Sequence, residues 1–451
     1  MLIKNKDELL SHGNIHGREV ILDVAEYAIK AVDAYESTKN TVRIHGNKLV
    51  VKDWTYDLTK VQNIYVVGAG KATFSIAKAL DEILGEKIRR GTIIVKRGEK
   101  RRLKNIKVIE AGHPIPDEAG LEGAKEIVEI VKEAKEDDVV ICAITGGASA
   151  LMPLPAKNIS LEDKKKATEL LLKCGATIDE INVVRNHISE IKGGKLAKYI
   201  HPAEIINLIV IDEVAGQPWG PTVPDSSTFK EAVRVLKKYN LWSKIPKTIK
   251  EHLRKGMRNP CMETLKAQDF EGFRFHNIVL ADNNVMCEAA KKRAEELGYN
   301  SLILSTKLEG ESREVGIVLA SIAKEAEKEG RPIKPPCILI FGGETTVTIA
   351  GHGGKGGPSQ ELVLGASMKI AGSEKIVIAS MDTDGTDGPT EIAGGITDGY
   401  TLKRANDIGL DIFKALKKHN STEVLTKLGD AIITGSTGTN VMDLNLIAVM
   451  S

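Results

Sequence analysis

The chain has 451 residues, of which 42% are hydrophobic, enough for two or three packed domains. Its 63 Lys and Arg nearly balance its 61 Asp and Glu, and only 4% of residues are aromatic, so we expect no nucleic-acid partner. Scattered cysteines without CxxC spacing, no apolar run near about 20 residues and no signal-peptide core predict a cytoplasmic protein that does not bind a membrane.

The first part of the chain alternates strand and helix patterns. Apolar spacing predicts an amphipathic helix at 18–34, and a hairpin follows at 41–52. Strands are then predicted at 61–67, 92–95, 107–110, 138–144 and 205–211, and helices at 72–84, 120–135, 161–174 and 178–186. Such alternation predicts a largely parallel sheet covered on both faces.

A second α/β section begins near residue 277. Strands are predicted at 278–281, 301–305, 337–341, 345–350, 375–380, 431–434 and 446–450, with helices at 284–297, 312–329 and 412–417. We place the domain boundary near residue 268, which gives an N-terminal domain of residues 1–268 and a smaller C-terminal domain of residues 269–451.

Glycine turns follow four strands at their carboxyl ends, at 68–71, 145–149, 342–344 and 383–388. In open parallel sheets the ligand lies outside these ends, and exposed N–H groups at glycine turns attract phosphate. The predicted nucleotide-binding residues of these turns are Gly68, Gly70, Thr145, Gly146, Gly147, Gly342, Gly343 and Glu344.

The first of these turns contains a lysine, Lys71, at the start of a helix. The turn is neither a complete GxGxxG, because Thr73 replaces the third glycine, nor a P-loop. A lysine at a helix N-terminus is mildly unfavourable, so its position favours a role facing a phosphate or carboxylate. The alternative is a surface lysine.

A glycine-dense loop at 351–357 predicts a mobile cover for a nucleotide, held through Gly354, Gly356 and Gly357 and with Lys355 reaching a phosphate. The alternative is a flexible loop with a solvated lysine.

An acidic turn, residues 382–390, brings Asp382, Asp384 and Asp387 close together. Hard oxygen ligands of this kind suit Mg²⁺ carried with a nucleotide, and one carboxylate can instead accept a proton from an attacking hydroxyl. The alternative is a purely structural turn, since Asp-Gly is a common pair in turns. Asp212, after the strand at 205–211, is read as a metal ligand or base, or else as a helix cap.

A cationic patch for a carboxylate is predicted from Arg185 and Lys192, interpreted as neighbours on one helix, with the Ser149 hydroxyl nearby. The alternative is a solvated helix end.

Seven segments together resemble the type II glycerate kinases, which carry a C-terminal domain of the MOFRL kind. They are VVGAGKA (66–72), GHPIPDEAG (112–120), TGGASALMPLP (145–155), INVVRNHISEIKGGKLA (181–197), GGETTV (342–347), GKGGPSQE (354–361) and DTDGTDGPTEIAGG (382–395). The resemblance covers nearly the whole chain and implies a Rossmann-like N-terminal domain followed by a smaller MOFRL-type domain.

The resemblance implies ATP-dependent phosphorylation of D-glycerate to 2-phosphoglycerate with a divalent cation such as Mg²⁺. Lys71 matches the catalytic lysine of the family. We expect Lys71 also to contact substrate, Asp384 and Asp212 to bind the metal, and Asp387 to accept the hydroxyl proton. The active site is expected in a cleft between the domains, and a homodimer is the commonest assembly.

One segment departs from the family pattern. Many bacterial members read GKGGRNQE, with an arginine implicated in catalysis, whereas Pro358 and Ser359 stand here. Lys355, our third catalytic candidate, or Arg185 would then supply the missing charge.

Two other functions compete with the kinase. An NADPH-dependent hydroxypyruvate reductase is one, although Lys96 and Arg97 stand where a dinucleotide enzyme carries an acid after its second strand. A non-catalytic sugar-phosphate-binding module is the other.

Overall fold

A computed structural model describes residues 2–98, 102–212, 220–349 and 353–451. Contacts divide the chain into two compact units, each built around a six-stranded sheet. The C-terminal unit comprises Met1–Ser37, Ile211–Gln217 and Ala281–Ser451, and the N-terminal unit comprises Thr38–Val210 and Pro218–Leu280. The predicted two-sheet α/β architecture is confirmed, and the boundary at residue 268 stays a prediction.

The sheet of the N-terminal unit has the strand order β6-β5-β4-β7-β8-β9. The strands are β4 (Ile64–Ala69), β5 (Ile88–Lys96), β6 (Lys107–Ala111), β7 (Val139–Ile144), β8 (Glu204–Val210) and β9 (Phe275–Ala281). β4 pairs in parallel with β5 and β7, as β5 does with β6 and β7 with β8. Every residue of β4 and β7 is buried, which explains their continuous apolar sequence.

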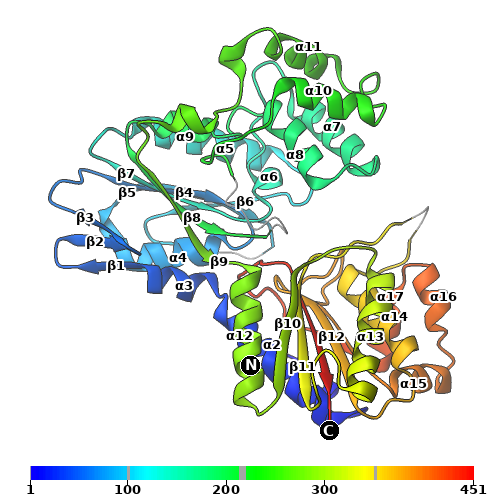
Figure 1. The fold of residues 1–451 in the computed structure, drawn as a ribbon. Coiled ribbons are helices and arrows are strands. Elements are labelled where there is room, and N and C mark those ends of the chain that lie inside the picture. Colours follow the sequence, from blue (N-terminus) through cyan, green and yellow to red (C-terminus); the bar gives the residue numbers. More distant parts are fainter. Residues whose placement is uncertain (1, 99–101, 213–219, 350–352) are drawn as a thin grey trace. The chain divides into compact units, whose positions relative to one another are not determined.

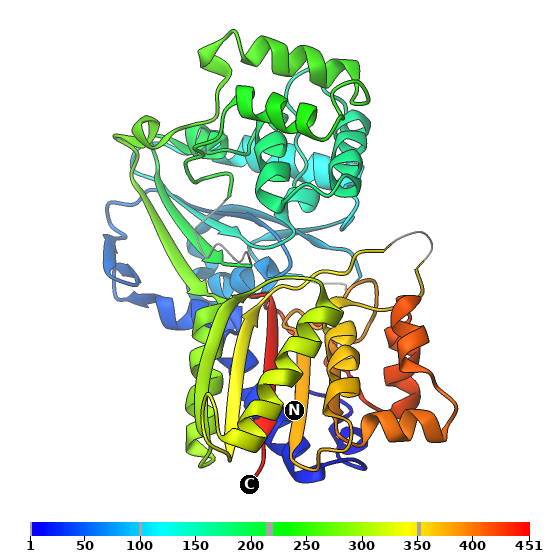
Figure 2. The ribbon, with the colours of Figure 1, turned by 45° about the vertical axis from the view of Figure 1, so that its right-hand side comes forward.

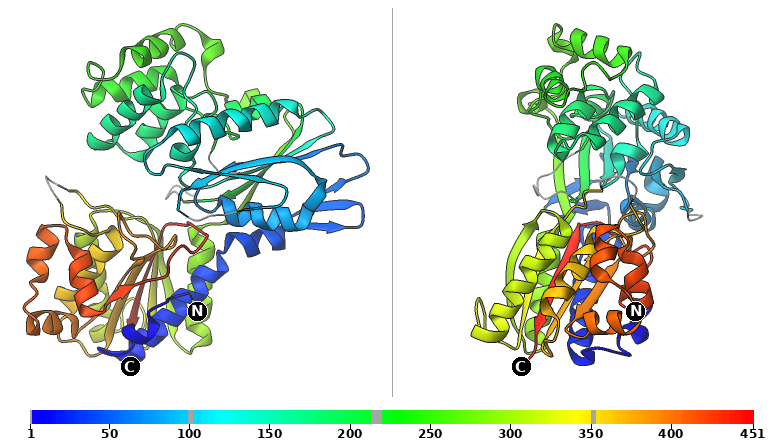
Figure 3. Two further views of the ribbon diagram at one scale, coloured as in Figure 1. Left: turned by 180° about the vertical axis from the view of Figure 1, so that it is seen from behind. Right: turned by 90° about the vertical axis from the view of Figure 1, so that its right-hand side faces the viewer.

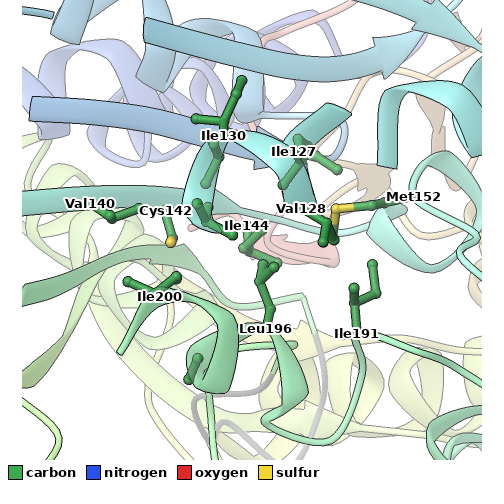
Figure 4. Packing of buried hydrophobic residues seen from close by; sticks show 14 of the residues in the cluster. Ile127, Val128, Ile130, Val140, Cys142, Ile144, Met152, Ile191, Leu196 and Ile200 are labelled. Atoms are coloured by element: carbon green, nitrogen blue, oxygen red, sulfur yellow. The ribbon is translucent and has the colours of Figure 1, made fainter. Parts of the chain in front are cut away.

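Helices cover this sheet on both faces. Alternate residues of β7 (Val140, Cys142 and Ile144) pack with α5 (Glu118–Glu133) and α9 (Lys195–Ile200), as Figure 4 shows. α4 (Thr73–Leu84) contacts β4, β5 and β7. A separate helical group of α7 (Leu161–Lys173), α8 (Ile178–His187), α10 (Phe229–Lys238) and α11 (Lys247–Gly256) has its own apolar core (Figure 1).

The remaining elements of the N-terminal unit are short. They are β1 (Val42–His45), β2 (Lys48–Val51) and β3 (Trp54–Asp57), which form a small antiparallel sheet, and α6 (Ala148–Leu151). α3 (Ala34–Thr41) precedes β1. The predicted hairpin at 41–52 is therefore confirmed.

The sheet of the C-terminal unit is mixed, with the order β10-β11-β15-β12-β13-β14. The strands are β10 (Asn300–Leu308), β11 (Cys337–Gly343), β12 (Ile376–Asp382), β13 (Gly394–Asp398), β14 (Ala431–Ile432) and β15 (Asp443–Val449). β10 and β11 are parallel, whereas β15 runs antiparallel to both β11 and β12 (Figure 2). The last strand of the chain thus lies in the middle of the sheet.

Helices from both ends of the chain cover this second sheet. α2 (Ile15–Ala31) packs with α12 (Asn283–Glu296) and contacts β12 and β15, so the predicted N-terminal helix belongs to the C-terminal unit (Figure 3). α13 (Ser312–Glu329) packs closely against α14 (Pro358–Ile370), and both contribute to the apolar cluster with β11, β12 and β15. The shorter helices are α1 (Lys6–Leu9), α15 (Thr401–Asp407), α16 (Ile412–Lys417) and α17 (Ser421–Leu428).

The predicted strand at 345–350 is wrong over its described residues. β11 ends at Gly343, whose φ of +136° turns the chain out of the sheet. Thr346 then makes only an isolated bridge to Glu311, and its N–H donates to the Gly310 carbonyl oxygen. No helix in the described part of the chain is both long and apolar enough to cross a membrane.

Candidate active site

The glycine turns after β4 and β7 pack directly against each other, because the two strands are parallel neighbours. The Lys71 N–H donates to the Gly146 carbonyl oxygen at 2.8 Å. The Ala72 N–H donates to the Thr145 hydroxyl at 3.1 Å, and the Thr145 N–H donates to the Ala69 carbonyl oxygen at 3.1 Å. The structure therefore brings together two segments that the sequence singled out separately.

The close packing of these turns explains why glycine is needed in them, because a side chain would collide with the neighbouring turn. A Cβ atom on Gly68 would lie 2.3 Å from the Ala143 carbonyl oxygen, and one on Gly70 would lie 2.0 Å from the Thr145 hydroxyl oxygen. Gly147 has a φ of +87°, and a Cβ there would lie 3.0 Å from His113 Nε2 and 3.4 Å from Lys71 Cγ. Lys71, His113 and Gly147 are thus immediate neighbours.

Cationic side chains gather in the same unit. Lys192 is buried, and its Nζ donates to the Ser149 hydroxyl at 2.6 Å. Arg185 is half-buried, and burial lowers the pKa of its guanidinium. Its expected place beside Lys192 on one helix is wrong, because α8 ends at His187 and Lys192 follows in the next segment.

Lys164 on α7 belongs to this cationic group and was not predicted from the sequence. Its side chain is buried, and burial followed by the charges of Lys192, Arg185 and Lys195 lowers its pKa well below the ordinary value. Burial likewise lowers the pKa of Lys195 to about 8. The helical spacing of the sequence could have indicated this position. Lys164 falls on the same face of the amphipathic helix as the buried residues Leu161, Ala167 and Leu171.

The second group of candidate residues lies at one edge of the sheet in the C-terminal unit. β11 and β12 are both antiparallel to β15, so their carboxyl ends meet the amino end of β15. In register, Asp443 lies between Gly343 on one side and Asp382 on the other. Glu344 and the acidic turn therefore leave the sheet at the same edge.

Asp443 is the acidic residue that the sequence analysis missed. It is 4% exposed, and one of its carboxyl oxygens accepts no hydrogen bond from the described residues. Burial, followed by the charges of Asp382, Asp387 and Glu344, raises its pKa. Only strand pairing reveals its place, because 52 residues of sequence lie between the end of the acidic turn at residue 390 and Asp443.

Two carboxylates of the acidic turn have structural roles: Asp384 stabilises the turn itself, and Asp387 caps a helix. Asp384 accepts hydrogen bonds from the Thr386 N–H at 2.8 Å and hydroxyl at 2.7 Å. Asp387 accepts from the N–H groups of Ser359 at 3.1 Å and Gln360 at 2.9 Å, the first turn of α14. Burial raises the pKa of Asp387 to about 7. Both oxygens of Asp387 are therefore already engaged in capping α14.

The glycines of the C-terminal unit that were predicted to bind nucleotide also have close neighbours. A Cβ on Gly342 would lie 1.5 Å from the Asn283 side-chain oxygen, and one on Gly343 would lie 2.2 Å from the Leu308 nitrogen. A Cβ on Gly357 would meet the Asp387 carboxyl group at 2.4 Å. A Cβ on Gly354 would lie 2.7 Å from Asn420 Cβ, and a Cβ on Gly356 would lie 2.2 Å from the Ser421 hydroxyl oxygen.

Two other candidates lie in this unit. Lys355 is exposed, and its N–H donates to the Asn420 side-chain oxygen at 3.3 Å. Asp212 accepts from the Asn440 side-chain amide at 3.2 Å. Residues 351 and 352 of the predicted covering loop lie outside the described residues.

Glu344, Asp382 and Asp443 lie at the same end of this sheet, and carboxylate oxygens are the donors that Mg²⁺ prefers. One buried oxygen of Asp443 lacks a hydrogen bond from the described residues. Within the described part of the chain, no three His, Cys, Asp or Glu side chains form a group able to hold a metal ion by themselves.

Comparisons with known proteins agree on one family. The model of a domain of unknown function, DUF4147, matches residues 20–254, and the MOFRL family model matches residues 337–443. Glycerate 2-kinase of Pyrococcus horikoshii is 46% identical over 439 residues, covering 96% of this chain and 98% of the relative. D-glycerate 2-kinase of Thermotoga maritima is 39% identical over 416 residues, covering 91% and 96%.

A solved structure is similar over the same length. The crystal structure of glycerate kinase from Thermotoga maritima matches with a TM-score of 0.81 at 37% identity, covering 96% of this chain and 99% of that chain. A weaker relative, a putative hydroxypyruvate reductase of Agrobacterium vitis, is 35% identical and covers 85% of this chain and 98% of its own. The resemblance drawn from the seven motifs is therefore confirmed: the chain belongs to the glycerate kinase family, whose enzyme class is that of the kinases, the phosphotransferases.

Proposed function

We propose that this enzyme phosphorylates D-glycerate at its 2-hydroxyl group, using ATP and a divalent cation, to give 2-phosphoglycerate. The observation that carries the proposal is the 46% identity, over nearly all of both chains, to a protein named glycerate 2-kinase. The active site would draw on residues of both units, as expected of the predicted cleft.

The N-terminal unit would bind the acid substrate and the transferring phosphoryl group. Lys71 lies at the carboxyl end of β4 beside the turn of Gly146 and Gly147, where its charge would offset the charge of the phosphoryl oxygens. Phosphoryl transfer depends mainly on such positioning and charge neutralisation. Lys192 and Arg185, with the Ser149 hydroxyl, would bind the substrate carboxylate.

The C-terminal unit would hold the nucleotide through residues 342–344 and 354–357. Asp384 and Asp212 would hold Mg²⁺, and the register of the sheet adds Asp382 and Asp443 as nearby oxygen donors. When bound, the ion would supply a Lewis acid at the phosphate oxygens. Asp387 remains a candidate acceptor for the hydroxyl proton, with its role as a cap of α14 as the competing explanation.

The experiment that tests the proposal measures ATP- and Mg²⁺-dependent phosphorylation of D-glycerate by the wild type, Lys71→Ala and Lys87→Ala. Lys87 is an exposed lysine just before β5, at the opposite edge of the same sheet, and serves as the matched control. We expect kcat to fall about 100-fold or more in Lys71→Ala, since preorganised charge at such a site supplies several kcal/mol. Equal activity of the two variants would refute the role of Lys71.

A reductase is the second candidate function, favoured by the name of the Agrobacterium vitis relative. Oxidation of NADPH by hydroxypyruvate in the absence of ATP would support it and overturn the kinase proposal. A protein that binds glycerate and ATP without turnover would instead be a binding module. We further propose a cytoplasmic homodimer, as expected from the cysteine pattern and from the commonest symmetry of enzymes.

A further inference from the structure

A buried lysine on α7 has no role in the proposed function so far. Ser160 caps α7 by accepting a hydrogen bond from the Asp163 N–H at 3.0 Å, which fixes the first turn. Lys164 in the next position is 4% exposed and lies on the buried side of the helix. Its neighbour Lys165 lies on the outer side and forms an ion pair with Glu162 at 2.7 Å. The two lysines differ in burial on the same helix.

The surroundings of Lys164 are those of a cation without a protein counter-charge. Its Nζ donates to one backbone group, the Leu154 carbonyl oxygen at 3.4 Å, and no carboxylate among the described residues lies within ion-pair distance. The charges that act on it belong to Lys192, Arg185 and Lys195, all positive. Burying a cation among cations is costly unless an anion completes the site.

Two short segments hold these cations in place. The Leu154 carbonyl oxygen also accepts from the Ser189 hydroxyl at 3.1 Å, and the Lys192 N–H donates to that same hydroxyl at 3.3 Å. Lys192 Nζ in turn donates to the Ser149 hydroxyl at 2.6 Å. These backbone and hydroxyl bonds orient the amines of Lys164 and Lys192, and Lys164 has no carboxylate partner among the described residues, as a preorganised anion site requires.

We propose that Lys164, together with Lys192 and Arg185, binds the carboxylate of the substrate and so selects small anionic acids over uncharged alcohols. The inference rests on the proposed function, because it assigns the substrate of that reaction to this group. Lys164 is 4% exposed whereas Arg185 is half-buried, so the Lys164 amine would contribute a charge from the more buried part of the site.

The test uses the full-length enzyme and the substitutions Lys164→Met and Lys165→Met. Methionine keeps an unbranched apolar stem and removes the amine. We expect the KM for D-glycerate to rise about 10- to 100-fold in Lys164→Met, as for loss of a charge-assisted hydrogen bond, while the KM for ATP changes less than about twofold. Lys165→Met should match the wild type in both constants. The preference for D-glycerate over glycerol, measured as the ratio of kcat/KM values, should fall in Lys164→Met alone.

Three results would count against the inference. An unchanged KM for D-glycerate in folded Lys164→Met would contradict it, as would equal increases in both KM values, which indicate general damage to the fold. If Lys164→Met fails to fold, then Lys164→Gln is tested in its place. Should that variant also fail to fold, the wild type decides: stabilisation by D-lactate but not by the uncharged lactamide supports the inference, and equal stabilisation by both overturns it. Absence of D-glycerate phosphorylation by the wild type would refute the proposed function instead.

Discussion

Asp387 illustrates how one residue can satisfy a sequence prediction and a structural need at once. The three carboxylates of its turn suggest a metal ligand or base. In the fold, however, its oxygens accept the N–H groups of Ser359 and Gln360, and a Cβ on Gly357 would collide with its carboxyl group. The sequence could not reveal this contact, because Ser359 and Asp387 are 28 positions apart in the chain. Capping of α14 is enough to explain why an aspartate stands at position 387 and a glycine at position 357.

Removing the side chain of Asp387 should destabilise the protein. Asp387→Ala leaves two buried N–H groups at the start of α14 without their acceptor, so we expect a loss of about 1–3 kcal/mol in the free energy of unfolding. Asp387→Asn, which keeps one acceptor oxygen, should lose less. Urea denaturation measures both. If Asp387→Asn is as stable as the wild type yet loses more than 100-fold in kcat, the residue is the catalytic base and not chiefly a cap.

The same carboxyl group should make stability depend on pH. Burial raises its pKa from the ordinary value of 3.8 to about 7, so between these values the folded protein holds a proton that the unfolded chain has released. The contribution of Asp387 to stability must therefore fall as pH rises from about 4 to about 7. Unfolding measured across this range should show a shallower fall in Asp387→Asn than in the wild type. Parallel pH profiles would contradict the raised pKa.

At the scale of elements, local patterns predicted most helices and strands but not their partners. The spacing of apolar residues is enough to predict α2, whereas its packing on β12 and β15 depends on contacts with the other end of the chain. The central place of β15 and its antiparallel direction are equally non-local. The strand predicted at 345–350 failed because Thr346 pairs with the loop before α13 instead of extending β11.

A buried ion network attaches α2 to the C-terminal unit. Arg18 Nε lies 2.6 Å from Asp398 Oδ2, and Arg18 Nη1 lies 2.8 Å from Asp430 Oδ1, with all three side chains fully buried. His12 Nε2 lies 2.9 Å from the same oxygen of Asp430. Asp398 has Arg18 as its ion-pair partner, whereas Asp430 also pairs with Arg404.

Replacing Arg18 should therefore have a large effect. Arg18→Ala leaves the buried carboxylate of Asp398 without its cation and that of Asp430 with Arg404, and we expect a loss of about 3–5 kcal/mol in the free energy of unfolding. Lys30→Ala, at an exposed position of the same helix, is the matched control and should change stability by less than about 0.5 kcal/mol. Thermal or urea unfolding of both variants measures this difference. Similar losses in the two variants would show that the network does not stabilise α2.

At the scale of the whole molecule, the sequence predicted the α/β class, the two sheets and the family. The parallel sheet of the N-terminal unit followed from the alternation of strands and helices along the chain. The mixed sheet did not, since β15 enters it from the end of the chain. Motif patterns located the loops that carry the candidate site, but Lys164 and Asp443 emerged only from burial and strand register.

Identifying the phosphorylated carbon of the product is the sharpest test of phosphorylation at the 2-hydroxyl group of D-glycerate. The purified enzyme is incubated with ATP, Mg²⁺ and D-glycerate, and the phosphorylated carbon is identified by phosphorus NMR. We predict a new phosphate resonance coupled to the single proton on carbon 2, its appearance depending on both ATP and D-glycerate. A product coupled to the two protons on carbon 3, or no phosphorylated acid at all, would contradict the account.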